Sequence, residues 1–501
     1  MEIEERQTVY KMIENLSSPV NYKIPEVAVI LAAGHGKRIK SQKSKMLHKI
    51  WGVPTVERVL NACRKGIEDI NVIIVVGIKA KDVIEVISEH GNTALAFQEV
   101  QNGTGHAVQV ALEKITDKNF DGIVYVLPGD MGLIDADTMM FFRKKFISTG
   151  SDMMVLTGIY EGDPKENAYG RIIRVKAEDE NGVSSGKDYG KVVEIKEYKD
   201  ILALPDNSRY RVNYNGKAYS YTKQELIENN EFNSGVYAFM YKKLTGLVHS
   251  ISSNNAQKEI YITDLIALFN TKGYSVTAVS PLDPYVVMGF NNKSVLKEME
   301  NVARKKVYDK IKDIIEIDDP DDFFIAEEIV EQIIEMDAKG TPLDIRIGKG
   351  VHIDKGAKLN YNLDLRKDVY IGGNLIFGTN VTVHENVHLS SYPYQKFEIG
   401  NYVEILTGNI LKGNIIIGDH SRIESSVRMT GNDNHPLRIG KKVLIKGTSY
   451  IFGSIIEDGA QIEHSVIICK KVVRLSNADG SAKPVKFYLP AAEGIDAITG
   501  L

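Results

Sequence analysis

The sequence predicts an α/β domain with a mainly parallel sheet, followed by a parallel β-helix. Two observations carry this prediction. Short apolar runs alternate with helical stretches up to about residue 292, which is typical of a parallel sheet covered by helices. After residue 340 the apolar residues recur every six positions instead, which is the period of a hexapeptide β-helix.

Length and composition set the frame for these two domains. The chain has 501 residues, 43% hydrophobic and 26% charged, which is ordinary globular composition. The net charge of −4 has no polybasic character, so we expect no nucleic acid among the partners. The apolar runs are far shorter than the ~20 residues that a membrane helix needs, and no signal peptide is visible at the start. Together with only two cysteines, this predicts a cytoplasmic protein without a membrane span.

The chain divides into five predicted segments. Residues 1–25 form a short amphipathic helix and a loop, and residues 26–293 form the α/β domain. Residues 294–342 are helix-rich and charged and are predicted to be a helical linker. The β-helix covers residues 343–475, and the tail, residues 476–501, lacks its period.

Within the α/β domain the elements follow one another regularly. Buried strands are predicted near residues 27–31, 71–77, 94–98 and 124–127, and helices near 54–65 and 80–90. Two polar stretches, 177–187 and 205–230, interrupt this alternation. We interpret them as insertions into the domain.

The six-residue period of the β-helix is marked by glycines as well as by aliphatic residues. Glycine follows an apolar row position at Gly348, Gly372, Gly378, Gly400, Gly418 and Gly440. We expect each hexapeptide to form one face of a triangular coil, with one apolar side chain inward and glycine permitting the tight corner. The alternative, an antiparallel β domain, would show a period of two without the fixed step of six.

The first predicted strand runs directly into a glycine-rich loop, residues 32–38. Such loops let backbone N–H groups approach a phosphate closely, and Lys37, Arg38 and Lys45 add positive charge. The G-x-x-x-x-G-K-[ST] spacing of a Walker A loop is absent. A dinucleotide fingerprint is excluded as well, because Ile39 stands where its third glycine is needed. A mere glycine-rich turn is the structural alternative, and the nearby cations weigh against it.

The residues of this loop begin a series that resembles the sugar-1-phosphate nucleotidyltransferases, in particular the branch that makes UDP-N-acetylglucosamine. The matching segments, in order, are L-A-A-G-x-G-x-R at 31–38, K-M-L-H-K at 45–49, Q-E-V-Q-N-G-T-G-H-A at 98–107, G-D-M-G-L-I at 129–134, Y-G-R-I at 169–172, E-Y-K-D at 197–200, N-S-G at 233–235, E-I-Y-I-T-D at 259–264 and G-F-N-N at 289–292. The resemblance covers roughly residues 26–295. It implies a Rossmann-like nucleotidyltransferase domain.

The resemblance also implies a role for each matching residue. It implies catalytic roles for Arg38 and Lys45, nucleotide binding by Ala33, Gly34, Gln98, Gly103 and Thr104, sugar binding by Gly170, Glu197 and Asn233, and Mg²⁺ ligation by Asp130 and Asn291. The residue types agree with these roles, because Mg²⁺ takes one or two protein oxygens together with phosphate oxygens and water. Taken alone, Asp130 would be read as a helix cap, and Glu197 and Asn233 as polar surface residues.

The implied reaction joins UTP to a sugar 1-phosphate, N-acetylglucosamine 1-phosphate in the family, and releases pyrophosphate. Two residues depart from the family pattern, Ser44 before the lysine and Gly132 after Asp130. The stretch between Gly170 and Asn233 is also longer than in the family, so the insertions can reshape or cover the sugar pocket. The sugar can therefore differ from N-acetylglucosamine 1-phosphate.

The β-helix resembles the second domain of the bifunctional uridylyltransferases, which is a left-handed β-helix that acetylates glucosamine 1-phosphate. The acetyltransferase motifs of that family are not recognisable here; the segment from Ser390 to Lys396 interrupts the repeat without matching them. We therefore favour an oligomerisation scaffold, with a homotrimer implied by analogy. An active acyltransferase and a binding module remain the alternatives for this domain, and a catalytically silent nucleotide-sugar-binding scaffold the alternative for the chain.

Overall fold

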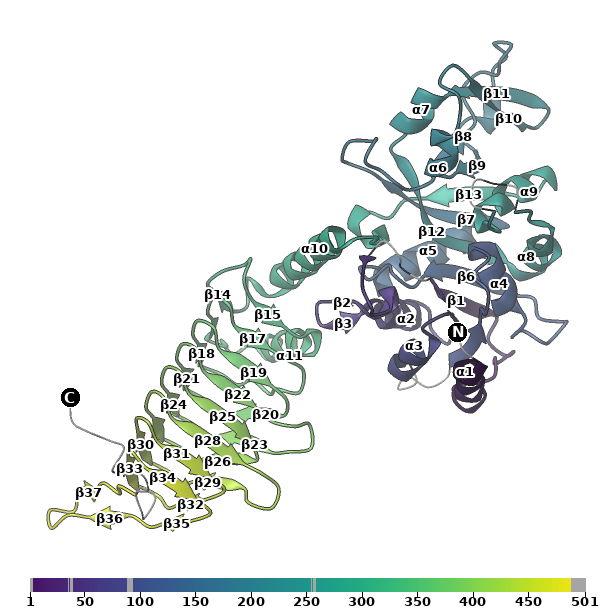
Figure 1. Cartoon of the computed structure of the whole chain (residues 1–501). Coiled ribbons are helices and arrows are strands. Elements are labelled where there is room, and N and C mark those ends of the chain that lie inside the picture. Colours follow the sequence, from purple (N-terminus) through teal and green to yellow (C-terminus); the bar gives the residue numbers. More distant parts are fainter. Residues whose placement is uncertain are drawn as a thin grey trace, which may run out of the picture. The chain divides into compact units, whose positions relative to one another are not determined.

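The computed structural model describes residues 3–34, 36, 39–87, 93–253, 255 and 258–487. The fold divides into two compact units, residues 1–300 and 301–501 (Figure 1). Among the described residues, no helix combines the length and the apolar composition that crossing a membrane requires.

A nine-stranded sheet forms the centre of the first unit. Its main path runs in the order β13-β7-β12-β6-β1-β4-β5, and β8 and β9 extend it beside β12. The strands are β1 (Glu26–Ala32), β4 (Asn71–Val76), β5 (Thr93–Phe97), β6 (Ile123–Pro128), β7 (Met153–Ile159), β8 (Arg171–Arg174), β9 (Val192–Lys196), β12 (Glu231–Met240) and β13 (Val276–Val279). β1, β4, β5 and β6 pair in parallel, whereas β12 runs antiparallel to both β6 and β7. The predicted α/β fold with a mainly parallel sheet is confirmed.

Helices cover both faces of this sheet. They are α1 (Ile3–Leu16), α2 (Thr55–Gly66), α3 (Ala80–Ile87), α4 (Thr104–Leu112), α5 (Ala136–Thr149), α8 (Tyr241–Leu247) and α9 (Leu265–Thr271), and a small pair of strands, β2 (Lys49–Ile50) and β3 (Val53–Pro54), precedes α2. Alternate residues of β1 join different cores: Ala28 and Ile30 pack in the core that holds α2, and Val27 and Val29 in the core that holds α4. Burial on both faces explains why these strands read as continuous apolar runs.

The second polar stretch, residues 205–230, folds into a small subdomain with its own core. A hairpin of β10 (Arg209–Tyr214) and β11 (Lys217–Thr222) forms a separate two-stranded sheet, flanked by α6 (Tyr198–Leu202) and α7 (Lys223–Glu228). Asn215 and Gly216 make the turn with positive φ angles of 46° and 75°, as a two-residue hairpin loop requires. Val212 and Tyr219 pack into a core that also includes Ile173 of β8.

The second unit is a left-handed parallel β-helix with three parallel sheets, seen in Figure 1 as a stack of short strands. The first sheet contains β14 (Glu316–Ile317), β16 (Ile345–Ile347), β18 (Leu363–Leu365), β21 (Val381–Val383), β24 (Glu404–Ile405), β27 (Arg422–Ile423), β30 (Leu444–Lys446) and β33 (Gln461–Glu463). The second contains β15 (Phe324–Ile325), β17 (His352–Ile353), β19 (Tyr370–Gly372), β22 (His388–Ser390), β25 (Ile410–Gly413), β28 (Arg428–Gly431), β31 (Tyr450–Phe452) and β34 (Val466–Ile468). The third contains β20 (Leu375–Phe377), β23 (Phe397–Ile399), β26 (Ile415–Ile417), β29 (Leu437–Ile439), β32 (Ile455–Ile456) and β35 (Lys471–Val472). Ile345 pairs with Leu363, and Leu363 with Val381, so these two coils advance by three hexapeptides, as the period predicts. The coil from Thr382 to Glu404 is longer than three hexapeptides.

Strands of this unit also occur on either side of the predicted β-helix limits. β14 and β15 lie between α10 (Lys293–Ile311) and α11 (Glu327–Asp337) and pair with β16 and β17, so the sheets begin inside the predicted linker. Beyond β35, β36 (Leu475–Ser476) and β37 (Ala482–Lys483) form a hairpin, and Val485 bridges to Ile462. The five domain limits drawn from the sequence stay predictions.

The glycines of the hexapeptide repeat do not turn the corners, contrary to our expectation. None of the six has a positive φ angle; the left-handed corner positions belong to residues such as Asp368, Asn380 and Tyr402. Five of them lie instead against the backbone of the next coil, and Gly372 lies against the Tyr370 ring: a Cβ on Gly378 would lie 2.6 Å from the carbonyl carbon of Gly400. Glycine is needed there because the coils approach too closely for a side chain.

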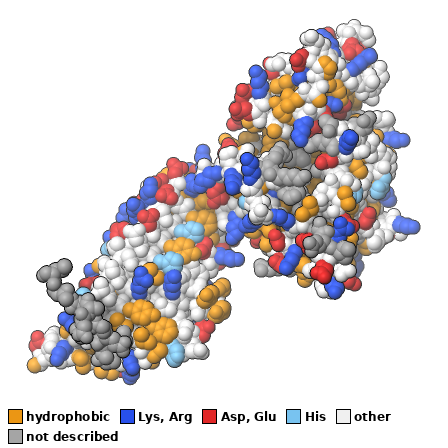
Figure 2. Space-filling view, viewed as in Figure 1, with side chains coloured by type: hydrophobic (Ala, Val, Ile, Leu, Met, Phe, Trp, Pro, Cys, Tyr) orange, Lys and Arg blue, Asp and Glu red, His pale blue; other side chains and the backbone are white. Residues whose placement is uncertain are grey.

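The outer face of the second sheet carries a stack of rings. Phe324, His352, Tyr370 and His388 follow one another on successive coils, with ring centroids 4.3, 5.1 and 4.6 Å apart. Figure 2 shows hydrophobic and histidine side chains following one another along the β-helix. In-register coils bring the same sequence position above itself, so similar side chains stack.

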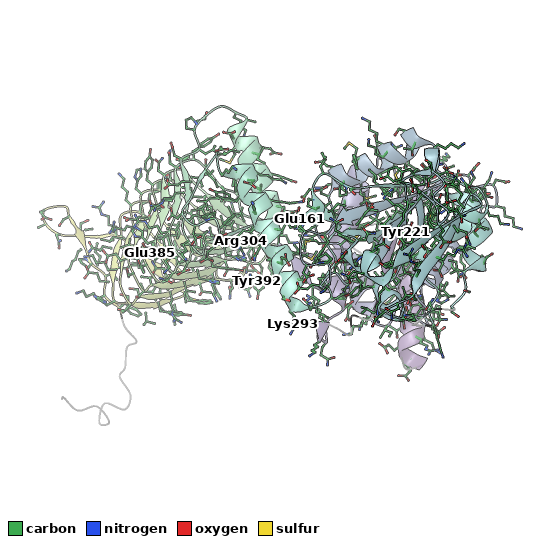
Figure 3. The ribbon with its side chains drawn as sticks, turned by 90° about the horizontal axis from the view of Figure 1, so that it is seen from above. Glu161, Tyr221, Lys293, Arg304, Glu385 and Tyr392 are labelled. Atoms are coloured by element: carbon green, nitrogen blue, oxygen red, sulfur yellow. The ribbon has the colours of Figure 1, made fainter. Side chains whose placement is uncertain are left out.

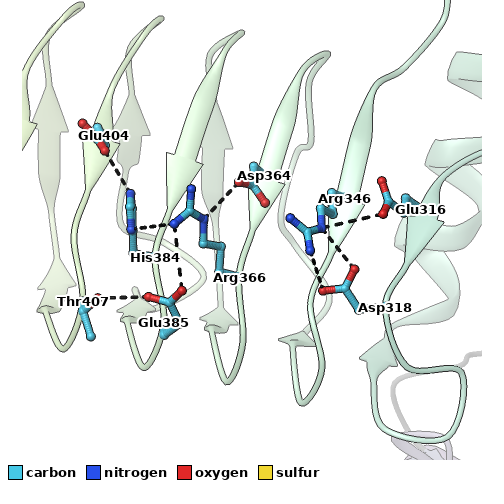
Figure 4. A network of polar contacts seen from close by, with 9 residues as sticks. All are labelled: Glu316, Asp318, Arg346, Asp364, Arg366, His384, Glu385, Glu404 and Thr407. Carbon is cyan, nitrogen blue, oxygen red and sulfur yellow. Dashed lines mark hydrogen bonds and ion pairs between the residues drawn. The ribbon is translucent and has the colours of Figure 1, made fainter.

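The outer face of the first sheet carries charges instead (Figure 4). Arg346 pairs with Asp318, and Arg366 pairs with Asp364. Arg366 donates to Nδ1 of His384 at 3.0 Å, so His384 carries its proton on Nε2, which donates to Glu404 at 2.9 Å. These contacts tie neighbouring coils together through their side chains.

Candidate active site at the carboxyl edge of the sheet

The predicted site residues gather where the parallel strands end. Ala33 and Gly34 follow β1, Gln98 follows β5, and Asp130 follows β6 after one glycine. Since β1, β5 and β6 all run in the same direction, these residues lie at the same edge of the sheet. Open α/β sheets bind ligands at this edge.

Three polar side chains from distant parts of the chain meet at this edge. Lys45, at the start of a short 3₁₀ helix, donates hydrogen bonds to the Asp130 carboxylate and, at 3.1 Å, to Oδ1 of Asn291. The side chains of Lys45 and Asp130 are 12% and 14% exposed. The ammonium also lies 5.3 Å from the centre of the Phe290 ring. The sequence predicted all three polar residues; Phe290 was missed, although it stands next to Asn291.

Glycines allow these segments to approach one another. Gly36 has a φ angle of +63°, and a Cβ there would lie 2.8 Å from Cβ of Lys45. A Cβ on Gly289 would lie 3.4 Å from Oδ2 of Asp130. The backbone of Gly36 therefore lies beside Lys45, and that of Gly289 beside Asp130. Arg38, together with Lys37, lies outside the described residues.

Gln98 is held in place by its own neighbours. Its amide Nε2 donates to the backbone oxygen of Gly103 at 3.0 Å and lies 3.2 Å from Nδ1 of His106. The side chain is buried, with 3% of the residue exposed. These contacts use the donor end of the amide and leave the oxygen as an acceptor for a ring N–H, such as that of uracil.

The start of α4 is fixed by a second segment of the chain. Gly103 has a φ angle of +99°, and a Cβ there would lie 2.6 Å from the backbone oxygen of Ile260. Thr104 accepts a hydrogen bond from the backbone N–H of Ile262 at 3.2 Å. Residues 98–107 and 259–264, which are separate segments in the sequence, thus form one structural element.

The three predicted sugar residues also come together. The backbone N–H of Asn233 donates to the oxygen of Gly170 at 2.9 Å, and a Cβ on Gly170 would lie 3.3 Å from Oε1 of Glu197. Oδ1 of Asn233 accepts from the hydroxyl of Tyr237 at 2.9 Å, which leaves the Asn233 amide N–H groups for another partner.

A cavity of about 290 Å³ opens beside Glu197, and we call it the sugar-side cavity. It is lined by Glu194, Ile195, Lys196, Glu197, Asp200, Tyr210, Ser250, Ile251, Ser252, Asn255, Tyr261, Thr263, Asp264, Ala267 and Leu268. The Thr263 hydroxyl oxygen is buried and makes no hydrogen bond with the described residues. A buried hydroxyl without a hydrogen-bond partner needs an explanation, and a bound ligand that pairs with it would supply one. Thr263 was missed as a site residue although it lies in the segment at 259–264.

Burial raises the pKa values of carboxyl groups that line the sugar-side cavity. It raises the pKa of Glu197 to about 7, with the nearby carboxylates Asp200 and Asp264 adding to the shift. Burial also raises the pKa values of Glu194 and Asp264. A carboxyl that is close to half-protonated at neutral pH can both accept and donate hydrogen bonds, which suits sugar hydroxyls.

Tyr169 connects the sugar side to the Lys45 side. Its hydroxyl donates to the backbone oxygen of Gly289 at 2.8 Å, and its ring stacks on Phe232 at 4.7 Å. Gly289 faces Asp130 and precedes Asn291 by two residues. The sugar side and the Lys45 side of the site are therefore connected through Tyr169 and Gly289.

The residues around Lys45 fit a divalent cation of the hard, oxygen-binding kind. A carboxylate from Asp130 and an amide oxygen from Asn291 converge on one point, and the Lys45 ammonium holds a positive charge there. The described residues contain no group of three or more His, Cys, Asp or Glu side chains placed to hold a metal ion. Two protein oxygens suit Mg²⁺, which completes its shell with phosphate and water.

This fold and this site define a sugar-1-phosphate nucleotidyltransferase domain joined to a left-handed parallel β-helix. Residues 28–173 match the model of the MobA-like NTP transferase domain. The bifunctional protein GlmU of Acetivibrio thermocellus is 30% identical over 468 residues, which cover 91% of this chain and 84% of the relative. The bifunctional protein GlmU of Caldanaerobacter subterraneus subsp. tengcongensis is 32% identical over 451 residues, which cover 88% and 86%. The chain belongs to the GlmU family.

Proposed function

We propose that the first unit transfers a uridylyl group from UTP to N-acetylglucosamine 1-phosphate, giving UDP-N-acetylglucosamine and pyrophosphate. The observation that carries this proposal is the convergence of Lys45, Asp130 and Asn291 at the carboxyl edge of the sheet, where phosphates bind in open α/β folds. The membership in the GlmU family supports the same reaction class.

The proposed chemistry is a direct displacement at phosphorus. An oxygen of the sugar phosphate forms a bond to the α-phosphorus of UTP while the bond to the pyrophosphate oxygen breaks on the opposite side. A phosphate monoester has a second pKa of about 6, so the attacking group is largely dianionic at pH 7 and needs no general base. The protein then contributes position and charge rather than proton transfer.

Asp130 and Asn291 would hold Mg²⁺, which would neutralise phosphate charge when bound. Lys45, together with Arg38, would stabilise charge on the departing pyrophosphate. The backbone at Ala33 and Gly34 binds the nucleotide phosphates, and Gly103 and Thr104 shape the base side. Gln98 accepts the uracil N3–H through its free amide oxygen.

On the sugar side, the residues hold the acceptor in place. Glu197 binds sugar hydroxyls, and the free amide N–H groups of Asn233 donate to the sugar or its acetamido oxygen. A side chain at Gly170 would collide with Ile195, at 2.9 Å from Cβ, so this glycine contributes to the sugar side through its backbone. The orphaned Thr263 hydroxyl supplies a further hydrogen bond in the same cavity.

Pyrophosphate release from a panel of nucleotides and sugar 1-phosphates tests this proposal. We expect release with UTP and N-acetylglucosamine 1-phosphate, dependent on Mg²⁺ and abolished by EDTA. A faster reaction with another nucleotide or sugar would correct the substrate assignment. No release with any pair would favour a silent nucleotide-sugar-binding scaffold.

For the β-helix we propose an oligomerisation scaffold that forms a homotrimer and does not transfer acetyl groups. The proposal rests on the missing acetyltransferase motifs around residues 390–396 and on the regular stacking of the coils. Light scattering should give a mass three times that of the 55.8 kDa chain. Consumption of acetyl-CoA with glucosamine 1-phosphate would instead support an active acyltransferase.

A further inference from the structure

The hairpin β10–β11 reaches the sugar-side cavity. Its residue Tyr210 lines that cavity, although the hairpin forms a sheet of its own and belongs to the polar stretch that interrupts the α/β pattern. A second cavity, of about 310 Å³, lies between the hairpin and α9, and we call it the hairpin cavity. Glu194 and Ala267 line both cavities, so the two meet at these residues.

Tyr210 and Glu194 form a defined pair at this junction. The Tyr210 hydroxyl donates a hydrogen bond to Oε1 of Glu194, and Lys196 lies 4.6 Å above the centre of the Tyr210 ring. Burial raises the pKa of Glu194, whereas the hydrogen bond from Tyr210 opposes that shift. The tyrosine therefore fixes the position of a carboxyl group that faces two cavities.

The hairpin β10–β11 is held firmly by packing and hydrogen bonds, so it can form part of the wall of the sugar-side cavity. Tyr210 pairs across the hairpin with Tyr221, which Figure 3 labels in the first unit. The Tyr221 residue is 8% exposed, and its hydroxyl donates to the backbone oxygen of Arg174 at 2.5 Å. Tyr219 and Val212 of the same hairpin are buried in the subdomain core. The position of Tyr210 is thus set by a packed unit and not by a loose loop.

The two cavities differ in their polar groups. The sugar-side cavity is lined by four carboxyl groups and one ammonium group, those of Glu194, Glu197, Asp200, Asp264 and Lys196. The hairpin cavity has the amides of Asn213, Asn215 and Asn270, and Glu194 is the one charged side chain among the described residues that line it. Asn270 donates to the backbone oxygens of Val192 and Val193, at 3.1 and 2.8 Å, which leaves its amide oxygen as an acceptor. Neutral amides match an amide substituent better than they match a bare hydroxyl or a charged group.

We propose that Tyr210 is a specificity-determining residue that selects a hexose 1-phosphate carrying an N-acyl substituent. The sugar ring occupies the sugar-side cavity beside Glu197 and the orphaned Thr263 hydroxyl, which is buried with 4% of the residue exposed. The N-acyl group lies against the Tyr210–Glu194 pair and continues toward the hairpin cavity. This inference rests on the proposed function of the sugar side, and it assigns to the hairpin a role in substrate choice.

Binding of sugar 1-phosphates to the full chain tests this role without relying on turnover. Calorimetry would compare N-acetylglucosamine 1-phosphate with glucose 1-phosphate for the natural chain and for Tyr210→Phe and Tyr210→Ala. We expect the preference for the N-acetyl sugar to fall at least about tenfold in Tyr210→Ala, the size of one lost polar contact. Tyr210→Phe keeps the ring, so it should fold as the natural chain does and lose part of the preference.

Tyr189→Ala is the matched control, because Tyr189 belongs to the same insertion-rich region, is 67% exposed and lines neither cavity. An unchanged preference in both Tyr210 variants would overturn the inference, and so would a natural chain that binds no sugar 1-phosphate. The kcat/KM for pyrophosphate release with UTP is measured in parallel. A lost preference in binding without any pyrophosphate release would support the hairpin's role while contradicting the proposed transferase reaction.

Discussion

Lys45 donates a hydrogen bond to the carboxylate of Asp130, and the two side chains are nearly buried although they are far apart in the sequence. The same ammonium contacts Asn291 at 3.1 Å. A positive charge therefore occupies the point where the two proposed metal ligands converge. We therefore expect a divalent cation to compete with Lys45 for these oxygens and to free the lysine for the substrate phosphates.

Asp130→Ala should remove turnover and leave the fold intact. The carboxylate supplies the charge that attracts the cation, so we expect pyrophosphate release to fall at least about 10²-fold. The β-strand before it is held by backbone pairing to β1 and β12, so circular dichroism should stay unchanged.

Asp137→Ala is the control for this variant, because Asp137 is an exposed residue in the first turn of α5. It should keep natural activity. If purified Asp130→Ala released pyrophosphate at the natural rate, the assignment of Asp130 as a metal ligand would be wrong.

Lys45→Ala should separate catalysis from metal binding. We expect kcat to fall about 10²-fold, since a charge that stabilises the leaving pyrophosphate is lost. We also expect Mn²⁺, followed by electron paramagnetic resonance as a probe for the site, to bind more tightly than in the natural chain, because the competing ammonium is gone.

Lys49→Ala is the control, because Lys49 is an exposed lysine of β2, and it should change neither kcat nor the affinity for Mn²⁺. Weaker Mn²⁺ binding in Lys45→Ala would contradict the competition between lysine and metal.

Glu197→Gln should change how stability depends on pH. The pKa of Glu197 is about 7 in the folded chain and near 4.5 ordinarily, so between these values the folded chain binds more protons than the unfolded chain. The free energy of unfolding therefore falls as pH rises from about 4.5 to 7 and then levels off. Glutamine has no such titration, so the Tm of the variant relative to the natural chain should rise across this window.

Thermal unfolding at several pH values between 4.5 and 8 would measure this difference. Glu161→Gln, a change at an exposed glutamate labelled in Figure 3, should give a difference that is flat with pH. A flat difference for Glu197→Gln as well would mean that its carboxyl is not buried in the free protein.

Gly400→Ala should destabilise the β-helix. A Cβ at this position would lie 2.7 Å from the backbone nitrogen of Asp419 on the next coil, and the backbone there cannot move aside without disturbing the sheet. We expect a loss of roughly 1–3 kcal/mol, the range for an overpacked site. Gly447→Ala is the matched control, because its Cβ would meet nothing closer than 3.8 Å and its φ angle is not positive. Equal Tm values for the two variants would contradict the close approach of the coils.

The order of elements in both units could be predicted from the sequence, because periodicity is a local property. β1 and β4 are buried on both faces and so appear as apolar runs, and the hexapeptide rows face the inside of the coil. The resemblance named Lys45, Asp130 and Asn291 one by one, and their meeting at one point required the sheet that aligns the ends of β1 and β6.

The glycines of the β-helix illustrate where sequence reasoning stops. The sequence shows the positions of the repeat glycines, but our prediction that they form the corners was wrong. The φ angles and the distance between coils cannot be obtained from a sequence. The same limit explains why Thr263 and Phe290 were missed. Each residue becomes important only through a neighbour from another segment. Thr263 lines the sugar-side cavity with Glu197, and the Phe290 ring lies beneath the Lys45 ammonium.

The sequence by itself determined the two-part architecture, the nucleotidyltransferase class and the residue types at the proposed phosphate site, since all of these follow from local periods and short motifs. Only the tertiary structure decided which of these residues share a site. It also showed that the hairpin of residues 209–222 places Tyr210 against Glu194 in the wall of the sugar-side cavity. The reason is physical: a polar insertion has no period of its own, and its position is set by packing against Ile173 and Val193 of the neighbouring strands.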